Sequence, residues 1–152
     1  MNRPQINIVA AMLNKGEQLR LKKALRIARL SLDCQFLPDQ EALIQHIRGC
    51  GRFANREQFP AADLIILNLE LDSIDAFTFL EQFKAECKRI CPAPLIVISA
   101  KHTDYQRRRA LALGVNSVIK KPDSFEALME IVNAIDNYWL KTVKLPAKKS
   151  QG

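Results

Sequence analysis

The chain has 152 residues, of which 48% are hydrophobic and 26% charged, with only five glycines and seven prolines. This composition is typical of one globular domain with its own core, and it excludes a fibrous or a disordered chain. The formal net charge of +7 leaves acidic partners such as nucleic acid open as an interpretation.

Two absences in the sequence favour a cytoplasmic protein. No apolar run reaches the ~18 residues that a membrane span needs, and residues 1–13 lack the long apolar stretch and the small-residue cleavage site of a signal peptide. The four cysteines and two histidines have no spacing typical of a zinc site. We therefore expect free thiols in a reducing compartment.

The first part of the chain alternates strand-like and helix-like segments. Residues 6–13 (INIVAAML) are short and apolar, as in a buried strand, and residues 17–29 repeat apolar positions at helical spacing. Residues 32–36 (LDCQF) alternate like a half-buried edge strand. A Pro-Asp pair then opens a helix, and residues 49–60 are a loop with two glycines and a proline.

The rest of the chain repeats this alternation three times. The predicted strands are residues 63–67, 95–99 and 117–120, and the predicted helices are residues 75–85, 104–113 and 125–139. Gly114 suits the C-terminal cap of the middle helix. We expect one domain over residues 1–145 and a basic, disordered tail over residues 146–152.

Five successive strand-helix units predict an α/β fold, (βα)5, with a doubly wound, five-stranded parallel sheet. Neither of the glycine-rich phosphate-binding motifs is present. Ligands of such sheets bind outside the carboxyl ends of the strands. The candidate site therefore consists of Ala10, Ala11, Asn68, Ser99 and the Lys120-Lys121 pair.

The residues around these strand ends resemble the response-regulator receiver domain, the phosphoacceptor module of two-component (phosphorelay) signalling. Residues 63–84 (DLIILNLELDSIDAFTFLEQFK) are similar to its third strand and helix, residues 95–100 (LIVISA) to its fourth strand, and residues 110–122 (ALALGVNSVIKKP) to the stretch that ends in its Lys-Pro. The ending at residues 134–146 (AIDNYWLKTVKLP) resembles stand-alone regulators of bacterial phytochromes. The resemblance spans about residues 5–140 and implies a flavodoxin/CheY-like fold.

The chemistry that this resemblance implies depends on a few side chains. In the family, a carboxylate at the end of the third strand attacks a phosphohistidine, and two acidic residues after the first strand help to hold Mg²⁺. A lysine and a hydroxyl stabilise the phosphoryl oxygens. An aromatic residue on the fifth strand passes the change to a partner surface.

Two of these positions match and four depart. Ser99 matches the hydroxyl and Lys121 the lysine. The departures are Asn68 at the phosphoacceptor position, Ala10 and Ala11 at the acidic pair, and Val118 at the aromatic switch position. Because an amide is not a workable nucleophile, we expect a stand-alone pseudo-receiver that is not an enzyme, has lost Mg²⁺ binding, and acts by protein-protein interaction.

Two other functions remain open from the sequence. The chain could be a phosphorylatable receiver that uses a non-standard residue, or a nucleic-acid-binding module with basic clusters at residues 15–29 and 107–109. No aromatic residues interleave with these basic ones, so nucleic acid is the weaker reading. The acidic loop residues Glu70, Asp72 and Asp75 could bind a cation weakly or simply be solvated.

The retained polar residues lead to two further expectations. Asn68, Ser99 and Lys121 could form a fixed polar cluster in which Lys121 faces the Asn68 oxygen, or Lys121 could point to solvent. A partner, such as a histidine kinase, another signalling protein or a second copy, would use the face of the fourth helix, fifth strand and fifth helix. Tyr138 and Trp139 would extend this face, unless Trp139 packs in the core.

Overall fold

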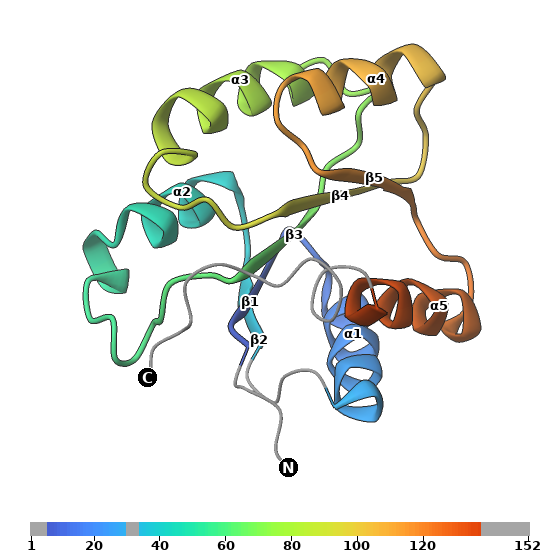
Figure 1. Cartoon of the computed structure of the whole chain (residues 1–152), viewed down its shortest axis with the longest axis horizontal. Helices are drawn as coiled ribbons and strands as arrows, with labels where there is room; N and C mark the ends of the chain where they lie inside the picture. The colour runs from blue at the N-terminus through green and yellow to red at the C-terminus, as the bar shows by residue number, and fades with distance from the viewer. Residues whose placement is uncertain (1–5, 30–33, 138–152) are drawn as a thin grey trace.

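The computed structural model describes residues 6–29 and 34–137 (Figure 1). Within this part of the chain, five strands alternate with five α-helices, and one short 3-10 helix precedes the third strand. The elements are β1 (Ile8–Ala11), α1 (Lys15–Ala28), β2 (Cys34–Leu37), α2 (Gln40–Arg48), η1 (Gly51–Phe53), β3 (Leu64–Asn68), α3 (Ala76–Cys87), β4 (Leu95–Ser99), α4 (Asp104–Ala112), β5 (Ser117–Lys120) and α5 (Phe125–Ile135).

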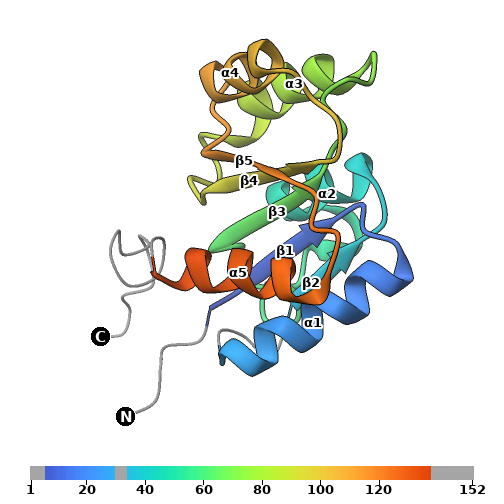
Figure 2. The ribbon, with the colours of Figure 1, turned by 90° about the vertical axis from the view of Figure 1, so that its right-hand side faces the viewer.

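The strands form one parallel sheet in the order β2-β1-β3-β4-β5. Helices α1 and α5 cover one face of the sheet, and α2, α3 and α4 cover the other (Figures 1 and 2). This arrangement confirms the predicted doubly wound (βα)5 fold, because a parallel sheet with a crossover helix after each strand must be covered on both faces.

The alternation of side chains along β3 builds two separate cores. Ile65 and Leu67 pack with buried residues of α2 and α3, whereas Leu64 and Ile66 pack with buried residues of α1 and α5. Successive side chains of a strand point to opposite faces, so a central strand of continuous apolar sequence supplies both cores at once. Because β3 is paired on both sides, its carboxyl end is held in a fixed position.

Short polar side chains mark where the helices begin. Asn14 caps α1 and Thr103 caps α4, each in a reciprocal capping box with the residue three positions later. Asp39 and Ser124 accept a hydrogen bond from the first turns of α2 and α5. At the other end of α4, Gly114 has φ of +101°, as expected for a residue that follows a helix.

Several predicted boundaries shift by one or two residues within the part of the chain that the structure describes. The strand predicted over residues 6–13 is the four-residue β1, since the chain turns at Met12, whose φ is +70°. All four cysteines are unpaired. No helix in residues 6–29 or 34–137 has the length and apolar character needed to cross a membrane.

Candidate functional site

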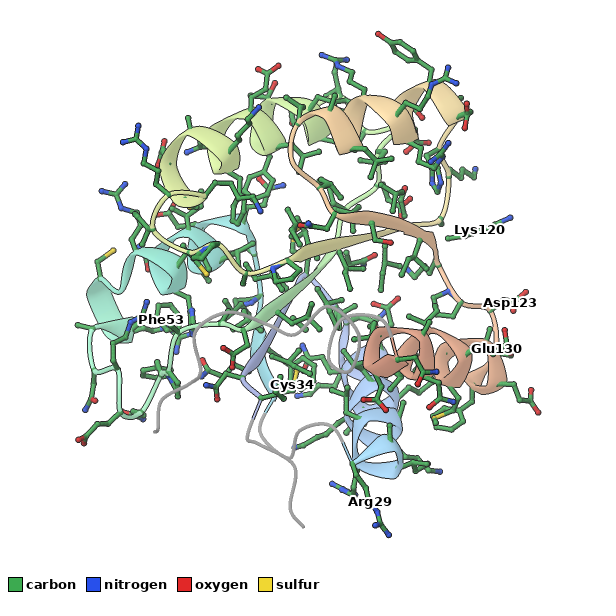
Figure 3. All side chains as sticks on the ribbon, viewed as in Figure 1. Arg29, Cys34, Phe53, Lys120, Asp123 and Glu130 are labelled. Carbon is green, nitrogen blue, oxygen red and sulfur yellow. The ribbon has the colours of Figure 1, made fainter. Side chains whose placement is uncertain are left out.

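The parallel sheet brings the predicted site residues to one edge. Ala11, Asn68 and Ser99 are the last residues of β1, β3 and β4, and Lys121 follows the last residue of β5. The register aligns Ala11 with Leu67 on one side of β3. Lys120, which ends β5, is exposed and points away from this edge (Figure 3). The site is therefore Lys121 with the ends of the three inner strands.

The Asn68 amide is held by the backbone of the β1–α1 loop. Its Nδ2 donates a hydrogen bond of 3.1 Å to the carbonyl oxygen of Met12. Its Oδ1 is buried and has no hydrogen-bond partner among the residues that the structure describes. An amide satisfies this carbonyl because it can donate a hydrogen, whereas an ionised carboxylate could only accept one. The local backbone therefore favours asparagine over aspartate at this position.

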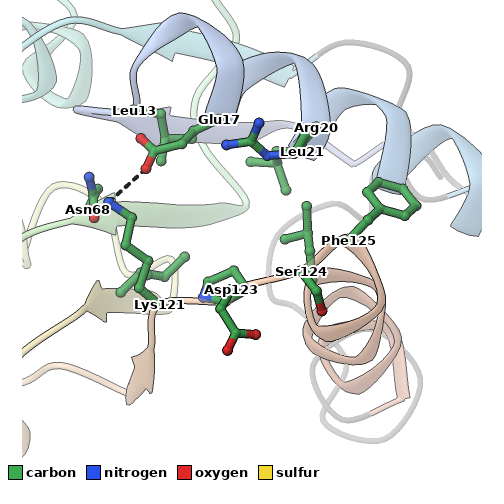
Figure 4. A pocket seen from close by; sticks show the side chains of 12 residues that line it. Leu13, Glu17, Arg20, Leu21, Asn68, Lys121, Asp123, Ser124 and Phe125 are labelled. Carbon is green, nitrogen blue, oxygen red and sulfur yellow. Dashed lines mark ion pairs between the residues drawn. The ribbon is translucent and has the colours of Figure 1, made fainter.

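Lys121 forms an ion pair with Glu17 in the first turn of α1. The Lys121 Nζ lies 2.7 Å from Glu17 Oε2, and their side chains are 36% and 14% exposed (Figure 4). Neither expectation for Lys121 named this partner: the ammonium binds the Glu17 carboxylate and makes no hydrogen bond to Asn68 Oδ1. The capping-box spacing of Asn14 and Glu17 was the only sequence signal for this partner.

The two carboxylate oxygens of Glu17 bind two different groups. Oε1 accepts a hydrogen bond of 2.9 Å from the backbone N–H of Asn14, and Oε2 receives Lys121. Burial raises the pKa of Glu17, but the hydrogen bonds from Lys121 and from Asn14 outweigh burial, so the pKa lies below its ordinary value. The carboxylate therefore stays ionised and joins the start of α1 to the β5–α5 loop.

Ser99 and Glu70 form a second polar contact. Ser99 is fully buried, and its Oγ accepts a hydrogen bond of 3.0 Å from the backbone N–H of Leu71. The same Oγ lies 3.2 Å from Glu70 Oε1. Glu70 Oε1 also accepts hydrogen bonds from the backbone N–H groups of Ala100 (2.8 Å) and Lys101 (3.1 Å).

The contacts of Glu70 correct the picture of a uniformly solvated acidic loop. Asp72 and Asp75 are exposed, whereas Glu70 turns back onto the end of β4. No local sequence pattern predicts this difference between the three acids, because the contact joins residues about thirty positions apart. The predicted trio of Asn68, Ser99 and Lys121 does meet at one edge of the sheet, but its members bind different partners. Asn68 binds the Met12 carbonyl, and Ser99 binds Glu70 and the nearby backbone. Lys121 binds Glu17.

The side chains at this edge do not supply the ligands of a magnesium site. Mg²⁺ requires oxygen ligands in near-octahedral geometry, usually including one or two carboxylates. Ala10 and Ala11 carry no ligating atoms, the Asn68 oxygen is neutral and buried, and Glu17 already binds an ammonium. Among residues 6–29 and 34–137, no group of three or more His, Cys, Asp or Glu side chains could hold a metal ion.

A pocket of about 340 Å³ lies beside Lys121, between α1 and the β5–α5 loop (Figure 4). Its lining combines apolar side chains with charges of both signs. The lining residues are Leu13, Glu17, Arg20, Leu21, Asn68, Ile98, Lys121, Pro122, Asp123, Ser124, Phe125 and Leu128. The ion pair between Glu17 and Lys121 forms the wall on the side of the sheet edge.

The predicted switch position is a small aliphatic residue. Val118 is half-buried on β5, pairs with Val97 of β4, and packs against the core beneath α2, α3 and α4. It has no ring that could swing between two positions. Tyr138, Trp139 and the tail at residues 146–152 lie outside the described residues.

No family model matches the chain, but curated relatives and solved structures do. A probable methanogenesis regulatory protein, FilR2 of Methanothrix harundinacea, is 33% identical over 109 residues, which are 70% of this chain and 65% of FilR2. The chain thus spans slightly less than two thirds of that relative. Response regulator Rcp1 of Synechocystis is 26% identical over 136 residues, 88% of each chain.

Two solved structures share the fold over nearly the whole chain. The Mn²⁺-bound form of response regulator Rcp1 has a TM-score of 0.73 at 25% identity and covers 95% of this chain and 100% of its own. Response regulator RPA3017, described in red light signalling of R. palustris, has a TM-score of 0.82 over 94% of this chain and 99% of its own. At 22% identity, RPA3017 establishes likeness of fold alone.

Proposed function

We propose that the chain is a response-regulator receiver domain, similar to response regulator Rcp1, and that it acts in two-component signalling as a pseudo-receiver. In this proposal the domain binds partner proteins and is not an enzyme. It receives no phosphoryl group on an aspartate. It does not use the divalent cation with which Rcp1 has been crystallised.

The observation that carries the proposal is the state of Asn68. The residue ends β3 and donates its amide N–H inward to the Met12 carbonyl. A neutral, delocalised amide has no lone pair suited to attack on phosphorus. An aspartate in the same orientation would place an anion against a carbonyl oxygen, so the pocket is built around the amide itself.

The positions around Asn68 support the same proposal. With Ala10 and Ala11 at the end of β1, the edge lacks the carboxylates that would bind a hard cation. Lys121, which would otherwise neutralise phosphoryl oxygens, is engaged by Glu17 at 2.7 Å. Each retained polar group therefore already has a partner within the chain: Met12 for Asn68, Glu70 for Ser99 and Glu17 for Lys121.

Acetyl phosphate provides a direct test. The protein is incubated with acetyl phosphate and Mg²⁺ and weighed intact by mass spectrometry, beside a receiver domain that has the acceptor aspartate. We expect the control, but not this protein, to gain the mass of a phosphoryl group. Titration with Mg²⁺ and Mn²⁺ by calorimetry should give no saturable heat. An acid-stable or hydroxylamine-labile phosphoryl adduct would overturn the proposal.

The partner surface in this proposal is the face formed by α4, β5 and α5. Its described part includes the edge strand β5 and Tyr105 of α4, whose side chain is 64% exposed. A second copy of the chain is the occupant that we propose, because like surfaces on two copies can form a closed two-fold contact. Sedimentation equilibrium at tens of micromolar should show a dimer, and a monomer at that concentration would contradict this part of the proposal.

A further inference from the structure

One oxygen atom of Glu70 collects three hydrogen-bond contacts at the end of β4. Oε1 accepts from the backbone N–H groups of Ala100 at 2.8 Å and Lys101 at 3.1 Å, and it lies 3.2 Å from Ser99 Oγ. The Ser99 hydroxyl has one hydrogen, which it can give to Glu70 or to the Lys101 carbonyl oxygen, also at 3.2 Å. Two consecutive amides and one hydroxyl thus converge on a single point.

Such a group of donors has the chemistry of an oxyanion site. Successive backbone N–H groups that point into one concavity bind anions, and their hydrogen bonds to an ionised acceptor are shorter and stronger than those to a neutral one. The Ala100 and Lys101 amides lie on an exposed loop, where a dissolved oxyanion could reach them. We propose that the β4–α4 loop is an oxyanion-binding site whose ligand is the chain's own Glu70 carboxylate.

The Glu70 carboxylate links two loops that lie about thirty residues apart in the sequence. Glu70 belongs to the β3–α3 loop, and its partners belong to the β4–α4 loop. The neighbouring Leu71 N–H adds a second link to the buried Ser99 Oγ at 3.0 Å. Together these bonds fix the segment that leads into α4, so the position of that helix is set by the folded chain without any bound anion or covalent modification.

Hydrogen exchange followed by NMR tests the role of Glu70. We expect Glu70→Ala to speed exchange of the Ala100 and Lys101 amides at least tenfold, while amides in the middle of β3 and β4 keep their protection. Asp72→Ala is the matched control, because it removes an exposed acid from the same loop. Glu70→Gln keeps the shape of the side chain and an acceptor oxygen, so it should give an intermediate increase in the exchange rates of the same two amides. This variant replaces Glu70→Ala in the test if Glu70→Ala does not fold.

Inorganic phosphate tests whether the vacated site binds an anion. Titration into Glu70→Ala should shift the Ala100 and Lys101 amide resonances saturably and slow their exchange, with sodium chloride at equal ionic strength as the control. The wild type should show neither effect over the same range. Unchanged exchange in both Glu70 variants, absence of binding to Glu70→Ala, or equal phosphate binding by the wild type would each overturn the proposal. None of these results depends on whether acetyl phosphate modifies the protein.

Discussion

At the scale of single residues, His46 makes the stability of the fold depend on pH. The ring is fully buried, its Nε2 lies 2.9 Å from Gln35 Oε1, and it packs at a tilt against Phe53 with ring centroids 5.2 Å apart. Burial, and to a lesser degree the charge of Arg56, lowers the pKa of His46 to about 4. The neutral ring is therefore the form that the core accepts.

The sign of the pH effect follows from this lowered pKa. The unfolded histidine titrates near its ordinary pKa of about 6.5, so between that pH and the folded pKa only the unfolded chain takes up the proton. The stabilisation is complete above about pH 6.5 and is lost as the pH falls toward 4. Urea unfolding should show a loss of about 2 kcal/mol between pH 7.5 and pH 5.

The control for this prediction is His46→Gln, which has no ring to protonate. The variant should be less stable than the wild type at pH 7.5, because it loses the ring packing against Phe53. Its stability should change less between the two pH values. An equal loss of unfolding free energy in the wild type and in His46→Gln would contradict the prediction, because the pH dependence would then come from other groups.

The ion pair between Lys121 and Glu17 should be measurable by a double-mutant cycle. With Lys121→Met and Glu17→Gln, we expect a coupling free energy of about 1 kcal/mol, since the carboxylate side chain is only 14% exposed. The pair of Arg48 and Glu86, at 3.4 Å and about half exposed on both sides, is the control and should give a coupling near zero. Equal coupling free energies in the two pairs would contradict the prediction that partial burial strengthens the ion pair between Lys121 and Glu17.

At the scale of elements, the start of α1 supports the site. Asn14 Oδ1 accepts a hydrogen bond of 2.8 Å from the Glu17 N–H, and Glu17 Oε1 accepts one of 2.9 Å from the Asn14 N–H. Asn14→Ala should lower the free energy of unfolding by about 1 kcal/mol and should weaken the coupling between Lys121 and Glu17. Asn14→Ser preserves the cap and should retain most of both quantities in the same urea and double-mutant measurements.

The elements were largely predictable from sequence, but the contacts at the sheet edge were not. Strands such as β3 and β4 are short, apolar and bounded by polar residues, so their positions follow from a pattern of neighbours. The meeting of Asn68, Ser99 and Lys121 follows from the parallel sheet. The partners of Lys121 and Ser99 depend on which way the long side chains of Glu17 and Glu70 turn, and no local pattern fixes that direction for Glu70.

At the scale of the whole molecule, adjacent residues of β3 connect the two cores. Ile66 packs with α1 and α5, and Leu67 packs with the opposite layer; both are buried. Ile66→Ala and Leu67→Ala should each cost about 2–5 kcal/mol. Because one strand serves both layers, each variant should keep a single unfolding transition with an unchanged denaturant slope. Two separate transitions in either variant would show that the layers unfold independently.

The alanine pair at the end of β1 limits which substitutions this edge of the sheet can accept. Ala10 and Ala11 are both fully buried, and their methyl groups face opposite cores. An aspartate carboxylate buried at either position without a partner loses its hydration, which costs more than the ~1–3 kcal/mol of an uncharged polar group. We expect Ala11→Asp alone to lower the unfolding temperature and to leave calorimetric Mg²⁺ titrations flat. Building a metal site at this edge one substitution at a time would therefore pass through a variant that is less stable and still binds no metal.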